Sequence, residues 1–292
     1  MANLKEIKRK ISSVKGTQKT TRAMKLVSSA KLKRAEEVAK RSKVYASKLT
    51  ELLNEIAQKM NKSEGEIDNI FFKENPNPKT VDIVFVSADK GLCGGFNHQT
   101  IKRVTQLRKE YADCNIRLSG IGKKGIGFFR YNQIEMLNEI EDLSANPNYE
   151  RATEFISKLV EDYVQGKTDK IILVHNGYVN MITQEIVEQQ LLPVDSSAVN
   201  LDSVSMSELE VEPDDDDTLI DALVRRYINY SMYYALLNSL AAEHSARMQA
   251  MDAATNNAGE MVKKLTVAYN KARQEAITTE LIEIISGMES LK

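Results

Sequence analysis

The hydrophobic positions of the first sixty residues repeat at the heptad spacing of a coiled coil. Residues 3–60 contain no proline and a single glycine, Gly16. The chain therefore begins with a pattern that predicts one long helix over residues 1–62. Ten heptad positions, eight of them apolar, follow each other from residue 28: Ser28, Leu32, Ala35, Ala39, Ser42, Ala46, Leu49, Leu53, Ile56 and Met60.

Upstream of Ser28 the same spacing continues through Leu4, Ile7, Ile11 and Val14 and then meets three polar residues. These are Gln18, Thr21 and Lys25. Heptad positions form the seam along which a helix packs on its partner. Three consecutive polar seam positions interrupt the apolar pattern, and this predicts that the helix faces something other than its usual partner there.

A second long helical pattern runs from residue 218 to residue 290, interrupted only by Gly259 and Gly287. Alanines at several seam positions would let another helix approach closely. Nine of thirteen heptad positions are apolar: Leu240, His244, Arg247, Met251, Ala254, Ala258, Met261, Leu265, Ala268, Ala272, Glu275, Thr279 and Ile282.

The length of this second pattern predicts the architecture. A helix of that length extends about 110 Å, whereas a compact globule of this chain length has a radius of gyration of roughly 19 Å. The C-terminal helix, residues 216–292, must therefore protrude. Both terminal helices are tethered to the same middle domain, so we expect them to pair antiparallel as a rod on a globular foot.

The middle of the chain, residues 75–215, changes to short apolar runs that alternate with helical stretches. Strands are expected at 81–86, 115–119 and 170–174, with helices at 99–111 and 149–165. This alternation predicts an α/β domain with a mostly parallel sheet. His175 to Tyr178 carries a turn signal, residues 184–192 predict a returning antiparallel strand, and residues 195–217, ending in four aspartates, predict a polar loop.

Composition is that of a folded chain, with 42% hydrophobic and 28% charged residues and a net charge of −1. The charge is unevenly distributed, because residues 1–48 hold fifteen Lys and Arg against three Glu. Three interpretations of this basic arm stay open: a solvated helix face, an acidic protein partner, and nucleic acid. Nucleic acid is disfavoured, since Tyr45 is the only aromatic residue in the arm that could stack on bases.

No catalytic, cofactor or metal motif is found in the sequence. The run Asp89-Lys-Gly-Leu-Cys-Gly-Gly-Phe-Asn97 lacks the Gly-Lys-Ser/Thr that closes a P-loop. Gly120-Ile-Gly-Lys-Lys-Gly125 matches a dinucleotide fingerprint, but the helical run after it is short, so a tight strand-to-helix turn explains it better. Cys93 has no activating base assigned by sequence, and the three histidines show no metal-ligand spacing. We expect no catalytic site, cofactor or metal.

Several long motifs resemble those of the gamma subunit of F-type ATP synthases. They are Lys5-Glu-Ile-Lys-Arg-Lys-Ile-Ser-Ser-Val14, Thr17-Gln-Lys-Thr-Thr-Arg-Ala-Met24, the run from Asp89 to Asn97, Glu243-His-Ser-Ala-Arg-Met-Gln-Ala-Met-Asp-Ala-Ala-Thr-Asn-Asn-Ala258, and the stretch from Tyr269 to Gly287. The resemblance covers essentially the whole chain. It implies a central rotor shaft inside a ring of alpha and beta subunits, with the α/β domain and the epsilon subunit on the membrane c-ring.

The resemblance also implies site residues. Arg22, Met24 and Lys25 would meet an acidic loop of beta, and Arg273, Gln274 and Thr278 would contact the surrounding ring. Residues 281–285 would lie in its hydrophobic collar. The longest uncharged helical stretch, residues 227–242, is too short to cross a bilayer, and no leader or transit peptide is recognised. The expected location is the cytoplasmic face of a bacterial plasma membrane, and the alternative function is a coiled-coil adaptor or nucleic-acid tether.

Overall fold

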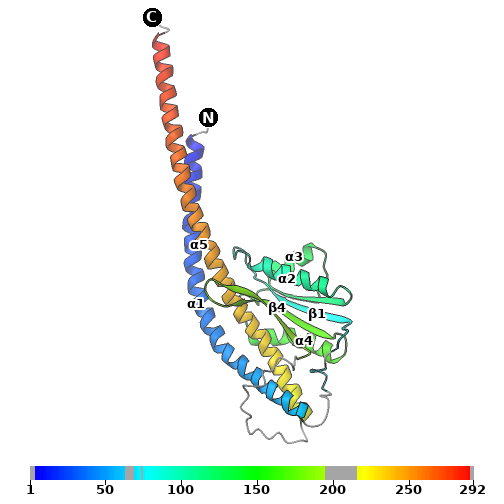
Figure 1. The fold of residues 1–292 in the computed structure, drawn as a ribbon. Helices are drawn as coiled ribbons and strands as arrows, with labels where there is room; N and C mark the ends of the chain where they lie inside the picture. Colours follow the sequence, from blue (N-terminus) through cyan, green and yellow to red (C-terminus); the bar gives the residue numbers. More distant parts are fainter. Residues whose placement is uncertain (1–3, 63–68, 74, 195–215, 290–292) are drawn as a thin grey trace. The chain divides into compact units, whose positions relative to one another are not determined.

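The computed structural model describes residues 4–62, 69–73, 75–194 and 216–289 (Figure 1). Two helices dominate it, α1 (Leu4–Lys62) and α5 (Asp216–Glu289). The chain divides into two compact units, one formed by residues 1–28 with 247–292 and the other by residues 29–246. We call them the terminal unit and the core unit. The compact units therefore do not coincide with the three segments expected from sequence, because the division falls inside both long helices.

The core unit contains the expected α/β fold. Its five strands lie in the order β3-β2-β1-β4-β5, parallel except for β5, which pairs antiparallel with β4. A mostly parallel sheet is thus confirmed. The strands are β1 (Thr80–Val86), β2 (Asn115–Ile121), β3 (Asn138–Ile140), β4 (Lys170–Tyr178) and β5 (Gln184–Leu192).

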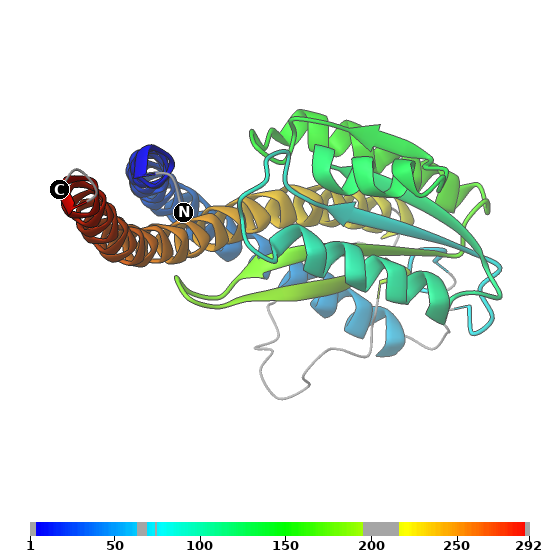
Figure 2. The ribbon, with the colours of Figure 1, turned by 90° about the horizontal axis from the view of Figure 1, so that it is seen from above.

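Each face of the sheet carries its own hydrophobic core. Helices α2 (Phe96–Glu110) and α3 (Lys123–Tyr131) cover one face, where Phe85 and Phe129 are fully buried. Helix α4 (Tyr149–Val164) and the first part of α5 cover the other, together with Leu53 of α1. Figure 1 and Figure 2 both show this yellow part of α5 beside the sheet. The core-unit parts of α1 and α5 therefore belong to the α/β fold.

Within the core unit, α1 and α5 run antiparallel as expected. The Tyr230 hydroxyl donates to the Ser42 carbonyl at 3.3 Å, and Arg226 Nε donates to the Tyr45 hydroxyl at 2.9 Å. The contacts pair rising positions on one helix with falling positions on the other, which is the antiparallel order.

The prediction of a turn at His175 to Tyr178 is wrong, because these residues continue β4. Asn176 is accommodated since its buried amide donates to the Phe96 carbonyl at 3.2 Å and to the Thr100 hydroxyl at 2.6 Å. Gly177 leaves room for Val187 of β5, which a Cβ would meet at 2.7 Å. The chain turns after Val179 instead, where Asn180 Oδ1 accepts the amides of Ile182 and Thr183.

The glycine fingerprint at residues 120–125 is a packing motif, in agreement with the sequence interpretation. A Cβ on Gly120 or Gly125 would come within 2.5 Å of the Phe85 ring. Gly122 has a φ of +98°, and a Cβ there would meet the Ser87 carbonyl oxygen at 2.0 Å. Glycine is therefore required by the close approach of β1 to the turn between β2 and α3.

The remaining elements start or end within a few residues of their expected positions. Helix α2 begins three residues before residue 99, and α4 starts at Tyr149, where the Asn148 side chain caps the helix by accepting the Arg151 amide at 2.9 Å. The short helical run noted after the glycine fingerprint is α3, which has nine residues, and β3 was given no bounds from the sequence. The expected polar loop lies largely outside the described residues, except that Asp216 and Asp217 begin α5.

Candidate partner interface

In the terminal unit, α1 and α5 form an antiparallel pair whose seam contains a polar layer. The Thr21 and Thr255 hydroxyls lie 2.8 Å apart, and Lys25 Nζ lies 2.6 Å from Asp252 Oδ1. Gln18 lies beside Gly259, where an added Cβ would be 2.9 Å from its amide nitrogen. The inference that α1 turns away from its partner at Gln18, Thr21 and Lys25 is therefore wrong. These residues face α5, and polar partners on α5 satisfy them.

The seam of α5 also differs from the predicted one at four positions, and at the last of them, Ile282, both neighbours in the chain are exposed too. Met261, Ala268 and Glu275 are exposed, while Val262, Tyr269 and Ala276 are half-buried in their place. The shared positions Met251, Ala258, Leu265, Ala272 and Thr279 hold as predicted. The predicted seam and the observed seam differ by one residue at every second position and have nearly the same apolar content. The apolar pattern of α5 alone therefore could not distinguish them.

An open groove of about 590 Å³ borders this polar layer. Its α1 wall carries Lys19, Arg22 and Leu26, and its α5 wall carries Asp252, Thr255 and Asn256. Among the residues the structure describes, neither Lys19 nor Arg22 has an ion-pair partner, whereas Lys25 is held by Asp252. Arg22 is exposed and Met24 is half-buried. The groove therefore presents unpaired cations next to one neutralised cation.

The structure does not bring the two predicted contact sets together. Arg273, Gln274 and Thr278 are all exposed on α5. Arg273 lies twenty-one residues beyond Asp252, which is about 30 Å of helix. A partner that contacts both sets must extend along the helix pair, or two partners must share it.

Apolar side chains are exposed at the C-terminal end of α5. Leu281, Ile282, Ile284 and Ile285 are between 54% and 60% exposed. All four lie beyond Thr279, the last half-buried seam residue. Exposed apolar clusters are typical of surfaces that contact another protein or a membrane.

Cys93 and Asp89 have structural roles in the glycine-rich loop after β1. Asp89 accepts the amides of Lys123 and Asp142 at 3.0 and 3.1 Å and the Ser144 hydroxyl at 2.8 Å. Cys93 is 2% exposed and packs with Phe96 and with Ala242 of α5. The motif therefore ties the loop to α3, to the segment after β3 and to α5.

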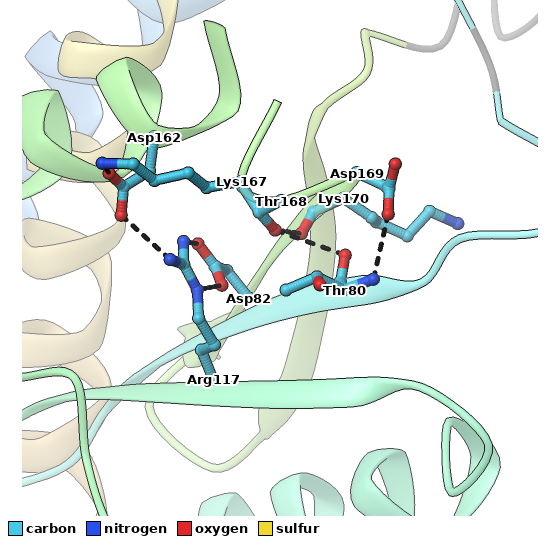
Figure 3. Close-up of polar contacts among 8 residues, drawn as sticks. All are labelled: Thr80, Asp82, Arg117, Asp162, Lys167, Thr168, Asp169 and Lys170. Atoms are coloured by element: carbon cyan, nitrogen blue, oxygen red, sulfur yellow. Dashed lines mark hydrogen bonds and ion pairs between the residues drawn. The ribbon is translucent and has the colours of Figure 1, made fainter. Parts of the chain in front are cut away.

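A charged network joins the sheet to α4 (Figure 3). Arg117 donates two hydrogen bonds of 2.6 Å to Asp82, which is 1% exposed, and one of 3.0 Å to Asp162. The hydrogen bonds that Arg117 donates to Asp82 raise the pKa of Arg117, and the Lys167 ammonium is the main cause of a lowered pKa at Asp162. Burial raises the pKa of Asp82 against the effect of Arg117. Each of these four charges has a partner, so Asp82 is not left as an uncompensated buried charge.

The part of the chain that the structure describes contains no group of three or more His, Cys, Asp or Glu side chains that could hold a metal ion. Within the same residues, no helix is long and apolar enough to cross a membrane.

Sequence reasoning missed the α5 side of the groove, above all Asp252, which pairs with Lys25. Asp252 lies directly after the seam residue Met251, at a position where coiled coils often carry charge, and α1 offers Lys25 with the opposite sign. The signal was present, but the pair could be identified only once the register between the two helices was known.

Comparison with known proteins agrees with this architecture along the whole chain. The ATP synthase family model, described as "ATP synthase", matches residues 3–291. The ATP synthase gamma chain of a Sulfurovum species is 70% identical over 295 residues, covering all of both chains, and that of Sulfurimonas denitrificans is 58% identical with the same coverage. The chain belongs to the ATP synthase gamma chain family.

Solved structures show the same fold at low sequence identity. A chain in the cryo-EM structure of the Euglena gracilis mitochondrial ATP synthase with OSCP, F1 and c-ring is 16% identical, with a TM-score of 0.66 over 99% of this chain and 94% of that chain. A chain of the Tetrahymena thermophila central stalk and c-ring structure is 23% identical, with a TM-score of 0.59 over 80% of this chain and 99% of that chain.

Proposed function

We propose that this chain is the rotor shaft of a proton-transporting bacterial ATP synthase. The observation that carries the proposal is the match along the entire chain to gamma chains at 58–70% identity, together with an antiparallel helix pair whose outer surface is charged and apolar. The chain couples ion-driven rotation to ATP synthesis and hydrolysis. It contributes no catalytic residue and binds no cofactor, because the nucleotide chemistry belongs to other subunits.

The coupling works through unequal contacts. A shaft with different side chains on its different sides favours one conformation of whichever neighbouring subunit faces each side. Turning the shaft changes which neighbour is favoured, so each catalytic subunit passes through states of different nucleotide affinity. The energy available is the difference in contact free energy between those states.

The groove of the terminal unit is the first proposed contact. Arg22, Met24 and Lys25 meet an acidic element of the beta subunit, where opposite charges guide the approach. Lys25 is already paired with Asp252, so its charge is shared between that pair and the partner. Lys19 and Arg22 are the cations of this groove that have no ion-pair partner among the described residues.

The second contact lies further along α5. Arg273, Gln274 and Thr278 bind the surrounding alpha and beta subunits, and residues 281–285 lie in an apolar collar of the same ring. The exposure of Leu281, Ile282, Ile284 and Ile285 supports this assignment, since burying them in the ring would remove apolar surface from water.

The core unit is the proposed attachment to the rest of the rotor. It binds the epsilon subunit and the membrane c-ring, one copy of the chain per complex, at the cytoplasmic face of the plasma membrane. No nucleic acid takes part.

Rotation of the chain itself tests the proposal. Tyr131 is 88% exposed in the core unit, so Tyr131→Cys offers a site for a visible marker, while Cys93 is buried and Cys114 is half-buried. With the catalytic ring of the purified complex fixed to a surface, millimolar Mg-ATP should make the marker rotate. The complex without Tyr131→Cys is the labelling control. A stationary marker on a complex that hydrolyses ATP would refute the proposal, as would ATP hydrolysis by the isolated chain.

A further inference from the structure

A groove in the core unit gathers arginine and tyrosine side chains from three helices. Arg41 and Tyr45 come from α1, Tyr149 is the first residue of α4, and Arg226, Tyr230 and Tyr233 come from α5. The groove is open to solvent and has a volume of about 910 Å³. All of these residues belong to one compact unit, so the groove is a property of that unit.

The charges in the groove are unbalanced. Arg225, also in its wall, pairs with Asp221 at 3.5 Å. Arg226 donates its Nε hydrogen to the Tyr45 hydroxyl, and Arg41 forms no ion pair with any residue that the structure describes. A further acid, Glu150, acts on Tyr233 and contributes, after burial and Tyr230, to the raised pKa of that tyrosine. Two guanidinium groups thus remain without a carboxylate partner in the described part of the chain.

The tyrosines form a continuous aromatic wall. The ring centroids of Tyr45 and Tyr230 lie 4.4 Å apart, those of Tyr230 and Tyr233 6.0 Å, and those of Tyr149 and Tyr233 5.7 Å. Arg226 lies 5.9 Å from the centre of the Tyr45 ring. Because the rings hold one another in place, an incoming side chain would meet a surface that loses little conformational entropy on binding.

We propose that this groove binds an acidic segment of another ATP synthase subunit. Two carboxylates of the segment pair with Arg41 and Arg226, and an apolar or aromatic side chain between them packs on the tyrosine wall. Tyrosine and arginine are among the residues that most often dominate protein interfaces, and a guanidinium can bind a carboxylate in a bidentate manner. The proposal rests on the proposed function only in that the partner is sought within the same complex.

The chemistry of the groove selects this occupant over a second copy of the chain. A symmetric pair built on this groove would place the arginines of one groove against those of the other, and like charges brought together oppose association. An acidic partner removes the imbalance instead.

Photo-crosslinking within the purified complex tests the proposal. With benzoylphenylalanine in place of Tyr149, which is 39% exposed at the groove, ultraviolet light should join the chain to another subunit. Mass spectrometry should then place the joined peptide in a segment with at least two Asp or Glu. Arg41→Glu with Arg226→Glu should lower the yield at least tenfold, because two attractive contacts become repulsive.

Lys102→Glu with Lys109→Glu is the matched control. Both lysines are exposed on α2, across the sheet from α4, and the change in net charge is the same. Its crosslinking yield should equal that of the otherwise unchanged complex, and thermal melting of each isolated chain verifies that both variants fold.

Several outcomes would overturn the groove proposal while leaving the proposed function intact. They are a complex that assembles and gives no crosslink, a crosslink to lipid or to a second copy of the chain, and a yield that falls equally in both charge-reversed variants. If the chain without substitutions fails to enter an ATP synthase complex at all, the proposed function fails instead.

Discussion

The same two helices are stabilised differently in the two units. In the core unit, α5 is buried on several sides, and Val224, Ile228, Met232 and Leu236 are fully buried against the sheet and α4. In the terminal unit, α5 has one narrow seam, and among the residues described beyond Arg247 only Met251 and Ala258 are buried, at 5% and 8% exposure. One helical sequence thus serves as the core of a domain over part of its length and as half of a loosely packed pair over the rest.

This difference shows which interactions determine the stability of each unit. Stability in the core unit comes from apolar burial, which is large for each side chain. The terminal unit relies on small side chains and polar pairs, each of which contributes little free energy. Its exposed surface is therefore available to other proteins, at the expense of stability of its own.

The largest expected effect is a contrast between two leucines of α5. Leu236→Ala removes a fully buried side chain from the core unit and should lower the free energy of unfolding by about 2–5 kcal/mol. Leu265→Ala removes a half-buried one from the terminal unit, and we expect about 1 kcal/mol or less, because its surroundings are already open to water. Urea unfolding of the full chain, followed by circular dichroism, measures both. Equal losses would mean that the two parts of α5 are packed alike.

The next largest effect is a pH dependence of the stability of the core unit. His175 is buried in β4, both ring nitrogens lack a hydrogen-bond partner in the described structure, and burial lowers its pKa to about 4. The unfolded chain, with an ordinary histidine pKa near 6.5, binds a proton in the window between these values that the folded chain does not. Protonation of the unfolded chain therefore lowers the free energy of unfolding as the pH falls from about 6.5 towards 4. The loss from His175 reaches up to about 3 kcal/mol, and above pH 6.5 there is none.

Unfolding measured between pH 4 and pH 7 checks this expectation. His175→Leu should remove this part of the pH dependence, while His98→Gln, at an exposed position on α2, should leave it unchanged. A slope that persists in His175→Leu would assign it to other groups.

A smaller effect concerns the polar layer of the terminal unit. Lys25 and Asp252 are 39% and 47% exposed, so the pair should contribute only about 0.2–1 kcal/mol and should weaken with salt. Lys25→Glu alone places like charges together and should destabilise the pair, and adding Asp252→Lys should restore most of the loss. A double-mutant cycle at low and high salt measures this coupling. No recovery in the double variant would exclude the ion pair as a source of stability.

The smallest expected change in free energy comes from reversing two charges in the groove, which should alter function and leave stability unchanged. Lys19→Glu with Arg22→Glu reverses the two unpaired cations of the groove without touching the seam. Each contact with an acidic element of the ring should change by about 0.2–1 kcal/mol. Folding and assembly should persist, while the number of protons pumped per ATP hydrolysed in inverted vesicles should fall. A pumping ratio equal to that of the unmodified enzyme at low and high salt would identify this face as merely solvated.

The sequence contained much of the fold because its long patterns repeat. Heptad spacing gave both long helices, and alternation of short strands with helices gave the parallel sheet. The three-residue β3 is too short to show a pattern, and the extension of β4 through His175 to Tyr178 depends on a buried Asn176 whose partners lie on α2. The α5 seam and the Lys25–Asp252 pair required the register between two helices, which only their three-dimensional packing defines.

The continuity of α5 has a mechanical consequence. None of the five prolines lies in this helix of 74 residues, so its hydrogen-bonded backbone is free of the commonest cause of a kink. It contains about twenty turns. If its two ends were twisted against each other by about 40°, each turn would change by only about 2°, well within the ordinary scatter of helical dihedral angles. Such a helix can therefore act as a torsion spring that stores elastic energy without breaking a single hydrogen bond.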